Sequence, residues 1–472
     1  MKNILVLCGA LFISIQGLMA QKEYKAYMVS NAHFDSQWNW DVQTSIEVYI
    51  RNTITQNLWL IEHFPDYVFN FEGGIKYNWM KEYYPTLYEQ VKMWISRGRW
   101  NVCGSTWDAN DPNLPSPESF FRNILLGQQF YKQEFGVQSN DIFLPDCFGF
   151  SYTLPTIAAH AGLIGFSTQK LQWRKHPFYG EEKVPFSIGL WQGIDGSRVM
   201  AALNANDYNT RWDGSDMSQD KGILALAQKS ADRIAYRYYG VGDRGGSPTI
   251  PTLVSLEKGI HGDGPVEIVS ARAGQLYEEY YPFDQHPELP VYDGELLMDV
   301  HATGCYTSQA AMKRFNRRNE QLADAAERAS VIADWLGAMT YPAEELRTEW
   351  RRFIWHQFHD DLTGTSIPRA YTFSWNDELI AQSKFANLAA AASGGVARGM
   401  DTYVKGIPVV IYNPVGERRR EVVEVVVPAN ERPRGVSAIS PRGERTPAQV
   451  LKYEDGKLHL AFIAEVDPVG YA

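Results

Sequence analysis

Four short segments of the sequence carry side chains that can bind a metal ion or transfer protons. The first contains His33 and Asp35, which directly follow the apolar run AYMVS. Residues two apart on an extended backbone project to the same side, so an imidazole nitrogen and a carboxylate oxygen can share one zinc ion. The pattern is short, and a purely structural role is the alternative for this pair alone.

The second and third segments follow the same logic. Asp146 stands at the end of a second apolar run and is followed by Gly149, which permits a sharp turn. His356 and His359 are three residues apart at the end of a helical pattern, so they share a helix face, and Asp360 comes next. A loop-capping aspartate and a pair of buried histidines are the structural alternatives.

The fourth segment, residues 294–308, contributes the carboxylates of Glu295 and Asp299 and the imidazole of His301. None of the four segments is specific by itself. Their occurrence together in one chain is what points to a catalytic site.

The elements around these segments indicate an α/β domain. Over residues 24–280, short apolar runs alternate with longer helical patterns, one of which begins at Ser116 and ends at Gly136. This alternation predicts a parallel sheet, open or closed into a barrel. In both arrangements the active residues lie at the carboxyl ends of the strands, where the first two segments fall.

The later part of the chain has a different character. Helical patterns cover residues 307–339 and 344–358, and a β-rich pattern follows Gly399. The 472 residues suffice for two to four domains, and 44% hydrophobic with 21% charged residues excludes wholesale disorder. A net charge of −10 argues against nucleic acid as a partner. The 13% aromatic residues can fill a core or line a groove for sugar rings.

The first twenty residues are typical of a secretory signal peptide. Lys2 precedes an apolar run that ends near Ala20, which predicts a secreted or periplasmic protein. No other stretch approaches the roughly 18 apolar residues of a membrane span, so none is expected. The cysteines beyond the leader, Cys103, Cys147 and Cys305, match no zinc or disulfide framework in their spacing.

Read together, the segments resemble glycoside hydrolase family 38, the class II α-mannosidases, and its bacterial and cytosolic branch in particular. The stretches WDANDPNLPSPESFF, FLPDCFGFS and HQFHDDLTGTSI carry the resemblance, which covers about residues 26–472. It implies an α/β fold: a seven-stranded α/β barrel followed by a three-helix bundle and the start of a β-sandwich domain. The predicted boundaries are a signal peptide at 1–20, a catalytic barrel domain at 24–285, a helical middle domain at 286–395 and a partial β-sandwich domain at 403–472.

The resemblance also implies a metal site and a nucleophile. Zinc would be held by His33, Asp35, Asp146 and His359. Asp146 would in addition attack the anomeric carbon, forming a covalent glycosyl-enzyme intermediate with net retention of configuration. In this family, sugar hydroxyls ligate the zinc, which orients and distorts the bound mannose rather than activating water.

Further residues are assigned by matching positions in the family pattern. Trp38 and Phe148 would wall the sugar site, and Asp360 would bind sugar hydroxyls. The general acid/base is predicted to be Asp299, with Glu295 as second choice, and an elevated pKa is expected for it. The stretch HGDGP places Asp263 where a residue contacts a second sugar.

The sequence thus predicts a retaining, zinc-dependent α-mannosidase acting on mannose-containing glycans. One alternative is a metal-dependent polysaccharide deacetylase, which uses a metal-bound water and forms no covalent sugar intermediate. The other is a non-catalytic periplasmic carbohydrate-binding protein. Family members usually continue for several hundred residues beyond the helical bundle and their β domains lend residues to the sugar site, so this chain is expected to end inside its first β-sandwich domain.

Overall fold

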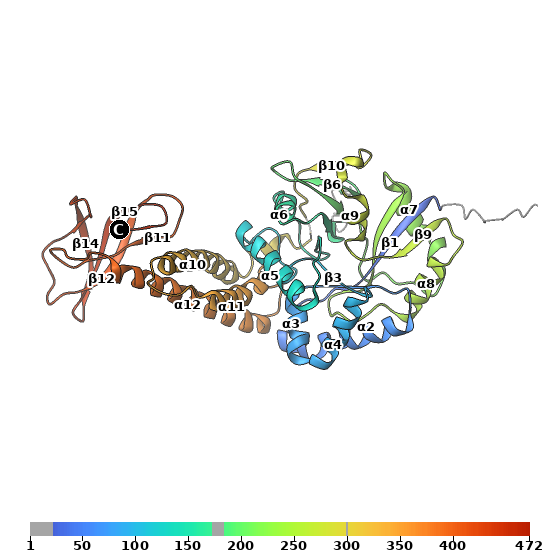
Figure 1. Ribbon diagram of the computed structural model, residues 1–472, viewed down its shortest axis with the longest axis horizontal. Helices are drawn as coiled ribbons and strands as arrows, with labels where there is room; N and C mark the ends of the chain where they lie inside the picture. Colours follow the sequence, from blue (N-terminus) through green and yellow to red (C-terminus); the bar gives the residue numbers. More distant parts are fainter. Residues whose placement is uncertain (1–21, 172–183, 299–300) are drawn as a thin grey trace, which may run out of the picture.

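The computed structural model describes residues 22–171, 184–298 and 301–472. An α/β domain, a helical bundle and a β-sheet follow one another along the long axis of the molecule (Figure 1). Within the described ranges, no helix combines the length and the apolar character that crossing a membrane requires. The leader predicted at residues 1–20 lies outside the described residues.

A parallel sheet forms the first half of the α/β domain. Its order is β3-β2-β1-β8, and β9 pairs with the first half of β1. Burial is nearly continuous along β1, as expected of a parallel strand covered on both faces. The strands are β1 (Tyr24–Ala32), β2 (Phe69–Glu72), β3 (Trp100–Cys103), β8 (Ile234–Val241) and β9 (Val266–Ser270).

A second, mixed sheet forms the other half, in the order β10-β6-β7-β5-β4. The strands β4, β5 and β7 are parallel, whereas β6 and β7 form an antiparallel pair. The strands are β4 (Asp141–Phe143), β5 (Gly165–Ser167), β6 (Ile188–Gln192), β7 (Arg198–Ala202) and β10 (Val291–Asp293).

The two sheets meet at the edges formed by β3 and β4. There the backbone N–H of Gly104 donates to Asp141 Oδ1 at 3.2 Å. A side chain therefore makes this contact, in place of the backbone hydrogen bonds that would pair β3 with β4 in one sheet. Among the described residues of the α/β domain, the strands therefore form two five-stranded sheets, and a closed seven-stranded barrel is not confirmed.

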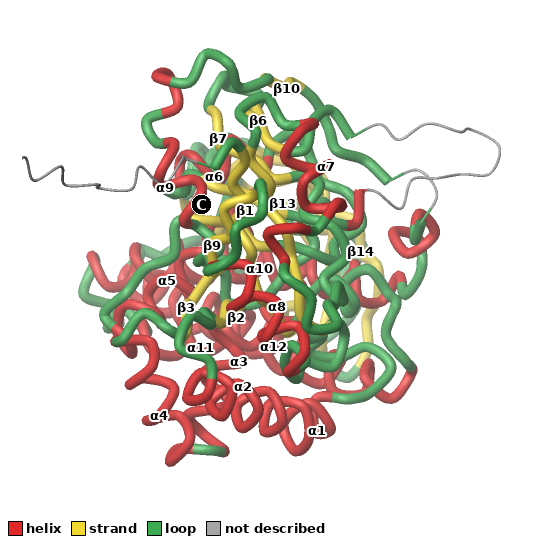
Figure 2. The backbone as a smooth tube through the Cα atoms, turned by 90° about the vertical axis from the view of Figure 1, so that its right-hand side faces the viewer, coloured by secondary structure: helices red, strands yellow, loops and turns green. Residues whose placement is uncertain are grey.

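Helices cover the outside of the α/β domain. In Figure 2 the strands β1, β2 and β3 run through the centre, with α2, α3 and α4 below them. The predicted helix start at Ser116 is confirmed, because its side chain accepts from the Ser119 N–H, and Gly136 ends this helix at φ 72°. The helices are α1 (Val42–Thr44), which continues through a π-helical turn (Ser45–Ile50) into α2 (Arg51–His63), then α3 (Gly74–Tyr83), α4 (Pro85–Ser96), α5 (Pro117–Phe135), α6 (Leu154–His160), α7 (Lys221–Lys229), α8 (Ile250–Ile260) and α9 (Gln275–Tyr280).

Three helices form the middle region: α10 (Ala310–Trp335), α11 (Ala343–Ile354) and α12 (Pro368–Gly399). The long helices α10 and α12 lie side by side in Figure 1. Buried alanines, among them Ala329 on α10 and Ala392 on α12, allow the two backbones to approach closely. The three-helix bundle agrees with the helical patterns in the sequence.

The C-terminal region is β-rich, as predicted. A four-stranded antiparallel sheet has the order β12-β15-β14-β13, and a two-stranded sheet joins β11 to β16. In the part of the chain that the structure describes, no second sheet covers the four-stranded one, so a sandwich is not formed there. The strands are β11 (Tyr412–Asn413), β12 (Arg419–Pro428), β13 (Val436–Ile439), β14 (Arg445–Glu454), β15 (Lys457–Val466) and β16 (Gly470–Tyr471).

Candidate active site

Two parallel strands and the helical bundle bring histidine and aspartate side chains to one place. His33 and Asp35 follow β1, Asp146 follows β4, and His359 follows a short helical turn (Trp355–Gln357) after α11. One ligand atom from each of the four residues lies within 4.8 Å of the others, and all four residues are buried. The structure therefore brings together the whole set that the sequence nominated as metal ligands.

The distances within this cluster suit a tetrahedral cation. His33 Nε2 lies 3.0 Å from Asp35 Oδ1, and His359 Nε2 lies 3.4 Å from the same oxygen. The two nitrogens lie 3.8 and 3.7 Å from Asp146 Oδ2. Ligands bonded tetrahedrally to zinc at its usual bond lengths are separated by about 3.4 Å.

The hydrogen bonding of the cluster also fits a cation. Within the described residues, His33 Nε2, Asp35 Oδ1 and His359 Nε2 are buried without a hydrogen-bond partner. Buried polar atoms of this kind are rare, and one cation would satisfy all three. His359 Nδ1 lies 3.1 Å from the carbonyl oxygen of Ala109, which accepts its proton and leaves the lone pair on Nε2.

Asp146 is held as an anion by its surroundings. Burial by itself would raise its pKa, but the charges of Lys170, His359 and His33 outweigh burial and hold the pKa well below its ordinary value. Lys170 Nζ lies 2.7 Å from Asp146 Oδ1 and donates to the Asp146 carbonyl oxygen at 2.8 Å. One carboxylate oxygen is thus fixed by Lys170, while the other faces the two histidines.

A second carboxyl group, Asp243, approaches Asp146 from the end of β8. The hydroxyl oxygen of Tyr208 lies 3.3 Å from Asp146 Oδ1 and 3.1 Å from Asp243 Oδ1. Through this shared hydroxyl the two Oδ1 atoms lie at most about 6.4 Å apart. The ring of Tyr208 stacks on His33 with centroids 5.0 Å apart, which fixes the tyrosine against the cluster of histidines and aspartates.

The shared hydroxyl also indicates where a proton resides. A hydroxyl has one proton, so Tyr208 satisfies both contacts only if one carboxyl group is itself protonated. Lys170 holds Asp146 ionised, so Asp243 is the carboxyl group of the pair that can take up the proton. Burial and the negative charge of Asp35 raise the pKa of Asp243, in agreement with that placement.

Asp243 was missed in the sequence, although a signal for it exists. The stretch YYGVGDRGG places an aspartate two residues after a strand and before a glycine pair, as Asp146 is placed before Gly149. The strand β8 carries Arg237 and several tyrosines, so its sequence does not show the apolar pattern of a central strand.

Of the three residues proposed to contact the sugar, Phe148 and Asp360 lie next to the cluster of histidines and aspartates. Phe148 is buried, with Lys170 Nζ 4.3 Å from its ring centroid and the ring of His359 6.1 Å away. Asp360 Oδ2 lies 3.7 Å from His359 Nε2, and burial raises the Asp360 pKa to about 7. Trp38 follows the same strand as the ligands and is partly exposed.

The remaining predicted residues divide into three cases. Asp299 lies outside the described residues. Glu295 is described, and its side chain is exposed to solvent. Asp263 precedes β9, whose first residue pairs with Tyr24 at the amino end of β1, so it lies at the opposite edge of the sheet from His33. Asp263 is therefore not part of this site.

His356 does not join the metal cluster despite its spacing from His359. Its Nδ1 lies 2.9 Å from Asp361 Oδ2 and its Nε2 3.3 Å from Asp377 Oδ2. Burial opposes protonation of His356, but these two carboxylates raise its pKa to about 9. Asp361 Oδ2 also accepts from Gln37 Nε2 at 2.9 Å. This buried network joins the segment after β1 to α12 and holds the His359 loop in place.

A cluster of this kind at the carboxyl ends of parallel strands defines a class of metal-site α/β enzymes. Within that class, residues 23–295 match the description "Glycosyl hydrolases family 38 N-terminal domain", and residues 300–388 match "Alpha mannosidase middle domain". The chain belongs to glycosyl hydrolase family 38.

Individual relatives agree with the family. Alpha-mannosidase G of Dictyostelium discoideum is 34% identical over 355 residues, which cover 75% of this chain and 31% of that protein. Human alpha-mannosidase 2C1 is 32% identical over 349 residues, which cover 74% of this chain and 32% of that protein. The chain therefore spans about a third of the length of these relatives.

A solved structure matches the fold. An alpha-mannosidase from Enterococcus faecalis V583 superimposes with a TM-score of 0.72 at 20% sequence identity, covering 95% of this chain and 55% of that chain. The shared fold thus extends over the α/β domain, the helical bundle and the C-terminal sheet of this chain.

Proposed function

We propose that this chain acts as a retaining, zinc-dependent α-mannosidase that hydrolyses α-mannosidic bonds in mannose-containing glycans. The observation that carries the proposal is the carboxyl pair Asp146 and Asp243, bridged by Tyr208 beside a buried cluster of histidines and aspartates. Retaining glycosidases use two carboxyl groups about 5–5.5 Å apart, and the contacts to Tyr208 allow this separation for the pair. The α-mannosidase relatives support mannose as the sugar.

Asp146 acts as the nucleophile in this proposal. It is ionised, and Lys170 holds one of its oxygens at 2.7 Å, so the carboxylate is fixed in orientation before substrate arrives. A bond forms between an Asp146 oxygen and the anomeric carbon as the bond from that carbon to the leaving group breaks. The covalent intermediate is then hydrolysed by water, and two inversions give net retention.

Asp243 acts as the general acid/base. Burial and the negative charge of Asp35 raise its pKa, which favours the protonated form; in that form it donates a proton to the departing glycosidic oxygen and later accepts one from the attacking water. Asp299, which the sequence nominated for this role, stays a prediction, and Glu295 is disfavoured because its side chain is exposed. The position of Asp243 across Tyr208 from Asp146 supports it over the exposed Glu295.

The four residues of the buried cluster, His33, Asp35, Asp146 and His359, would hold the zinc ion. A bound zinc ion supplies a positive charge to which vicinal sugar hydroxyls can bind, favouring the flattened ring of an oxocarbenium-like transition state. Phe148 would exclude water from one side of the sugar.

The decisive experiment combines one substitution with a metal measurement. Hydrolysis of an aryl α-mannoside is measured for the native chain and for Asp146→Ala, with zinc content determined for each. The proposal expects mannose release by the native chain and its loss in the variant. Retained mannoside hydrolysis by a zinc-loaded Asp146→Ala would contradict Asp146 as the nucleophile. Release of acetate from an acetylated sugar, without mannose release, would favour the deacetylase alternative, and mannoside binding without release would favour the carbohydrate-binding protein.

Secretion to the periplasm or the medium is part of the proposal and rests on the leader-like residues 1–20. Cell fractionation followed by N-terminal sequencing tests it. A mature protein that begins near Gln21 would support secretion, and a cytoplasmic protein that retains Lys2 would contradict it.

A further inference from the structure

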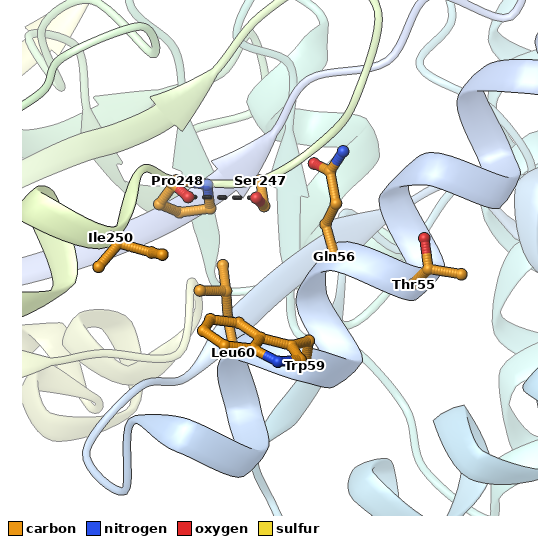
Figure 3. A pocket seen from close by; sticks show the side chains of 7 residues that line it. All are labelled: Thr55, Gln56, Trp59, Leu60, Ser247, Pro248 and Ile250. Atoms are coloured by element: carbon orange, nitrogen blue, oxygen red, sulfur yellow. Dashed lines mark hydrogen bonds between the residues drawn. The ribbon is translucent and has the colours of Figure 1, made fainter.

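A group of buried charged side chains lies beside the proposed zinc ligands and takes no part in the proposed reaction. It consists of Glu72, Lys76 and Asp108. The pocket between α2 and the loop that leads from β8 into α8 differs, because its lining side chains carry no charge (Figure 3). A buried ion pair is often no more stabilising than apolar side chains of the same size, so stability alone does not account for this group.

Asp108 is the member of the group that reaches the segments of two zinc ligands. Its Oδ2 accepts from the Ser36 hydroxyl at 2.5 Å, and Ser36 directly follows the ligand Asp35. Its Oδ1 accepts from the backbone N–H of Ala109 at 2.9 Å. The Ala109 carbonyl oxygen accepts from the His359 backbone N–H at 3.1 Å and also lies 3.1 Å from His359 Nδ1. Asp108 therefore joins the segment of one ligand to the segment of another.

The residues that follow Asp108 run antiparallel to the segment that ends at His359. Asn110 forms an antiparallel bridge with Phe358. Backbone hydrogen bonds of 2.8 and 3.1 Å lie on either side of this bridge. This pairing fixes residues 109–111 against the His359 segment, and the Asp108 side chain fixes the same stretch against Ser36. The spacing between the two ligand segments thus depends on Asp108.

Lys76 holds Asp108 from the neighbouring strand. Its Nζ lies 2.5 Å from Glu72 Oε1 and 3.4 Å from Asp108 Oδ1. Glu72 is the last residue of β2, which pairs with β1, and Lys76 lies in the first turn of α3. The Asp108 carboxylate is therefore fixed by the parallel sheet on one side and contacts the two ligand segments on the other.

We propose that Asp108 is a positioning residue for the zinc site, which sets the spacing of the Asp35 and His359 ligands through Ser36 and Ala109. This inference rests on the zinc cluster of the proposed function. Ligand atoms from separate segments must converge on one ion at bond lengths of about 2.0–2.2 Å, so a small shift between the segments weakens binding. Replacing a residue one step removed from the ligands typically lowers metal affinity by about 10–100-fold.

The test measures metal binding to the full chain and requires no turnover. The zinc dissociation constant is determined by competition with a chromophoric chelator for the native protein, Asp108→Ala and Asp108→Asn. Asp108→Ala is expected to raise this constant by about 10–100-fold. Asp108→Asn keeps an acceptor for the Ala109 N–H and a polar partner for Ser36, so it is expected to retain most of the affinity.

Asp141 provides a matched control in the same domain. It is buried like Asp108, and its Oδ1 likewise accepts from a serine hydroxyl, at 2.5 Å, and from a backbone N–H, at 3.2 Å. It begins β4, whereas the ligand Asp146 follows the other end of that strand. Asp141→Ala is therefore expected to lower stability as Asp108→Ala does and to bind zinc as the native protein does.

Cobalt-loaded protein gives a readout that a general loss of stability does not change. Cobalt(II) occupies zinc sites, and its visible absorption is stronger in a tetrahedral site than in a six-coordinate one. Asp108→Ala is expected to weaken this absorption and Asp141→Ala to preserve it. If Asp108→Ala does not fold, Ser36→Ala, which removes a single hydroxyl, replaces it and is expected to show the same changes in smaller degree.

Three outcomes overturn the positioning role: native zinc affinity and cobalt absorption in the Asp108→Ala or Ser36→Ala protein, an equal loss in Asp141→Ala, or an equal loss in Asp108→Asn. A native chain that binds no zinc would refute the metal site of the proposed function, and this inference with it. Zinc binding without mannoside hydrolysis by the native chain would refute the proposed reaction alone.

Discussion

Replacing Asp243 by asparagine tests the acid/base assignment most sharply. Asparagine preserves the size of the side chain and can still accept a hydrogen bond from Tyr208, which now lies 3.1 Å from Asp243 Oδ1. It cannot donate a carboxyl proton. General acid catalysis contributes about 10²–10⁴-fold, or about 3–5 kcal/mol of transition-state stabilisation, so this is the loss expected for a substrate whose leaving group needs protonation.

The leaving group separates a catalytic loss from a structural one. We expect kcat/KM of Asp243→Asn for methyl α-mannoside to fall by about 10²–10⁴-fold. Formation of the glycosyl-enzyme from 2,4-dinitrophenyl α-mannoside, measured as the pre-steady-state burst, should fall by less than about tenfold, since its leaving group departs without a proton. Because Asp243 must be protonated to act as the acid and its pKa is raised, activity should decline as the pH rises through that pKa, and this alkaline limb should vanish in the variant.

Two further variants complete this experiment. Glu295→Gln should retain native activity on both substrates, because the Glu295 side chain is exposed. Equal losses on both substrates for Asp243→Asn would refute the reasoning. The same would hold if Asp299→Asn, and not Asp243→Asn, showed the dependence on the leaving group.

Three other predictions concern stability and metal binding. Glu72 and Asp108 are buried carboxylates that lie 2.5 and 3.4 Å from Lys76 Nζ. Lys76→Met removes their cation and should lower the free energy of unfolding, measured in urea, by about 3–5 kcal/mol. The control Lys81→Met, at a partly exposed ion pair, should lower it by under about 1 kcal/mol. Burial raises the Glu378 pKa from 4.5 to about 8, so the contribution of Glu378 to stability is complete below pH 4.5 and is lost as the pH rises through about 8. The melting temperature of Glu378→Gln should therefore rise relative to that of the native protein between pH 5 and pH 9. The same difference in melting temperature at both pH values would contradict this. Chelation should lower the melting temperature of the native protein. Zinc at a hundredfold excess over its dissociation constant should then raise the free energy of unfolding by about 2.7 kcal/mol. A melting curve that neither chelation nor zinc alters would contradict zinc binding.

The sequence predicted those site residues that depend on local chain geometry. His33, Asp35 and Asp146 directly follow apolar runs, so the general position of active residues at strand ends made them candidates, and the resemblance to a family selected them as metal ligands. His359 is different, because it reaches the cluster from the segment between α11 and α12 of the helical bundle. Only the resemblance to a family, and no local pattern, singled it out from His356.

The residues that the sequence missed depend on long-range pairing. Asp243 approaches Asp146 because β8 pairs with β1 in a register that sets Val241 against Ala32, a contact between segments about two hundred residues apart. Lys170 and Tyr208 likewise become meaningful only once Asp146 lies between them. No local periodicity carries such information.

Local geometry also explains why the two histidines separate. His356 and His359 would share a face on a continuous α-helix, but the chain tightens into a 3₁₀ turn at Trp355–Gln357 and then leaves the helix. His356 consequently turns toward Asp361, and His359 toward the metal cluster.

Retention by way of Asp146 is tested directly by proton NMR of the sugar first released from 4-nitrophenyl α-mannoside by the zinc-loaded chain. We expect α-mannose to appear first and to mutarotate to the β-anomer afterwards, because Asp146 and water each invert the anomeric centre. Initial release of β-mannose, or no release of mannose, would contradict it.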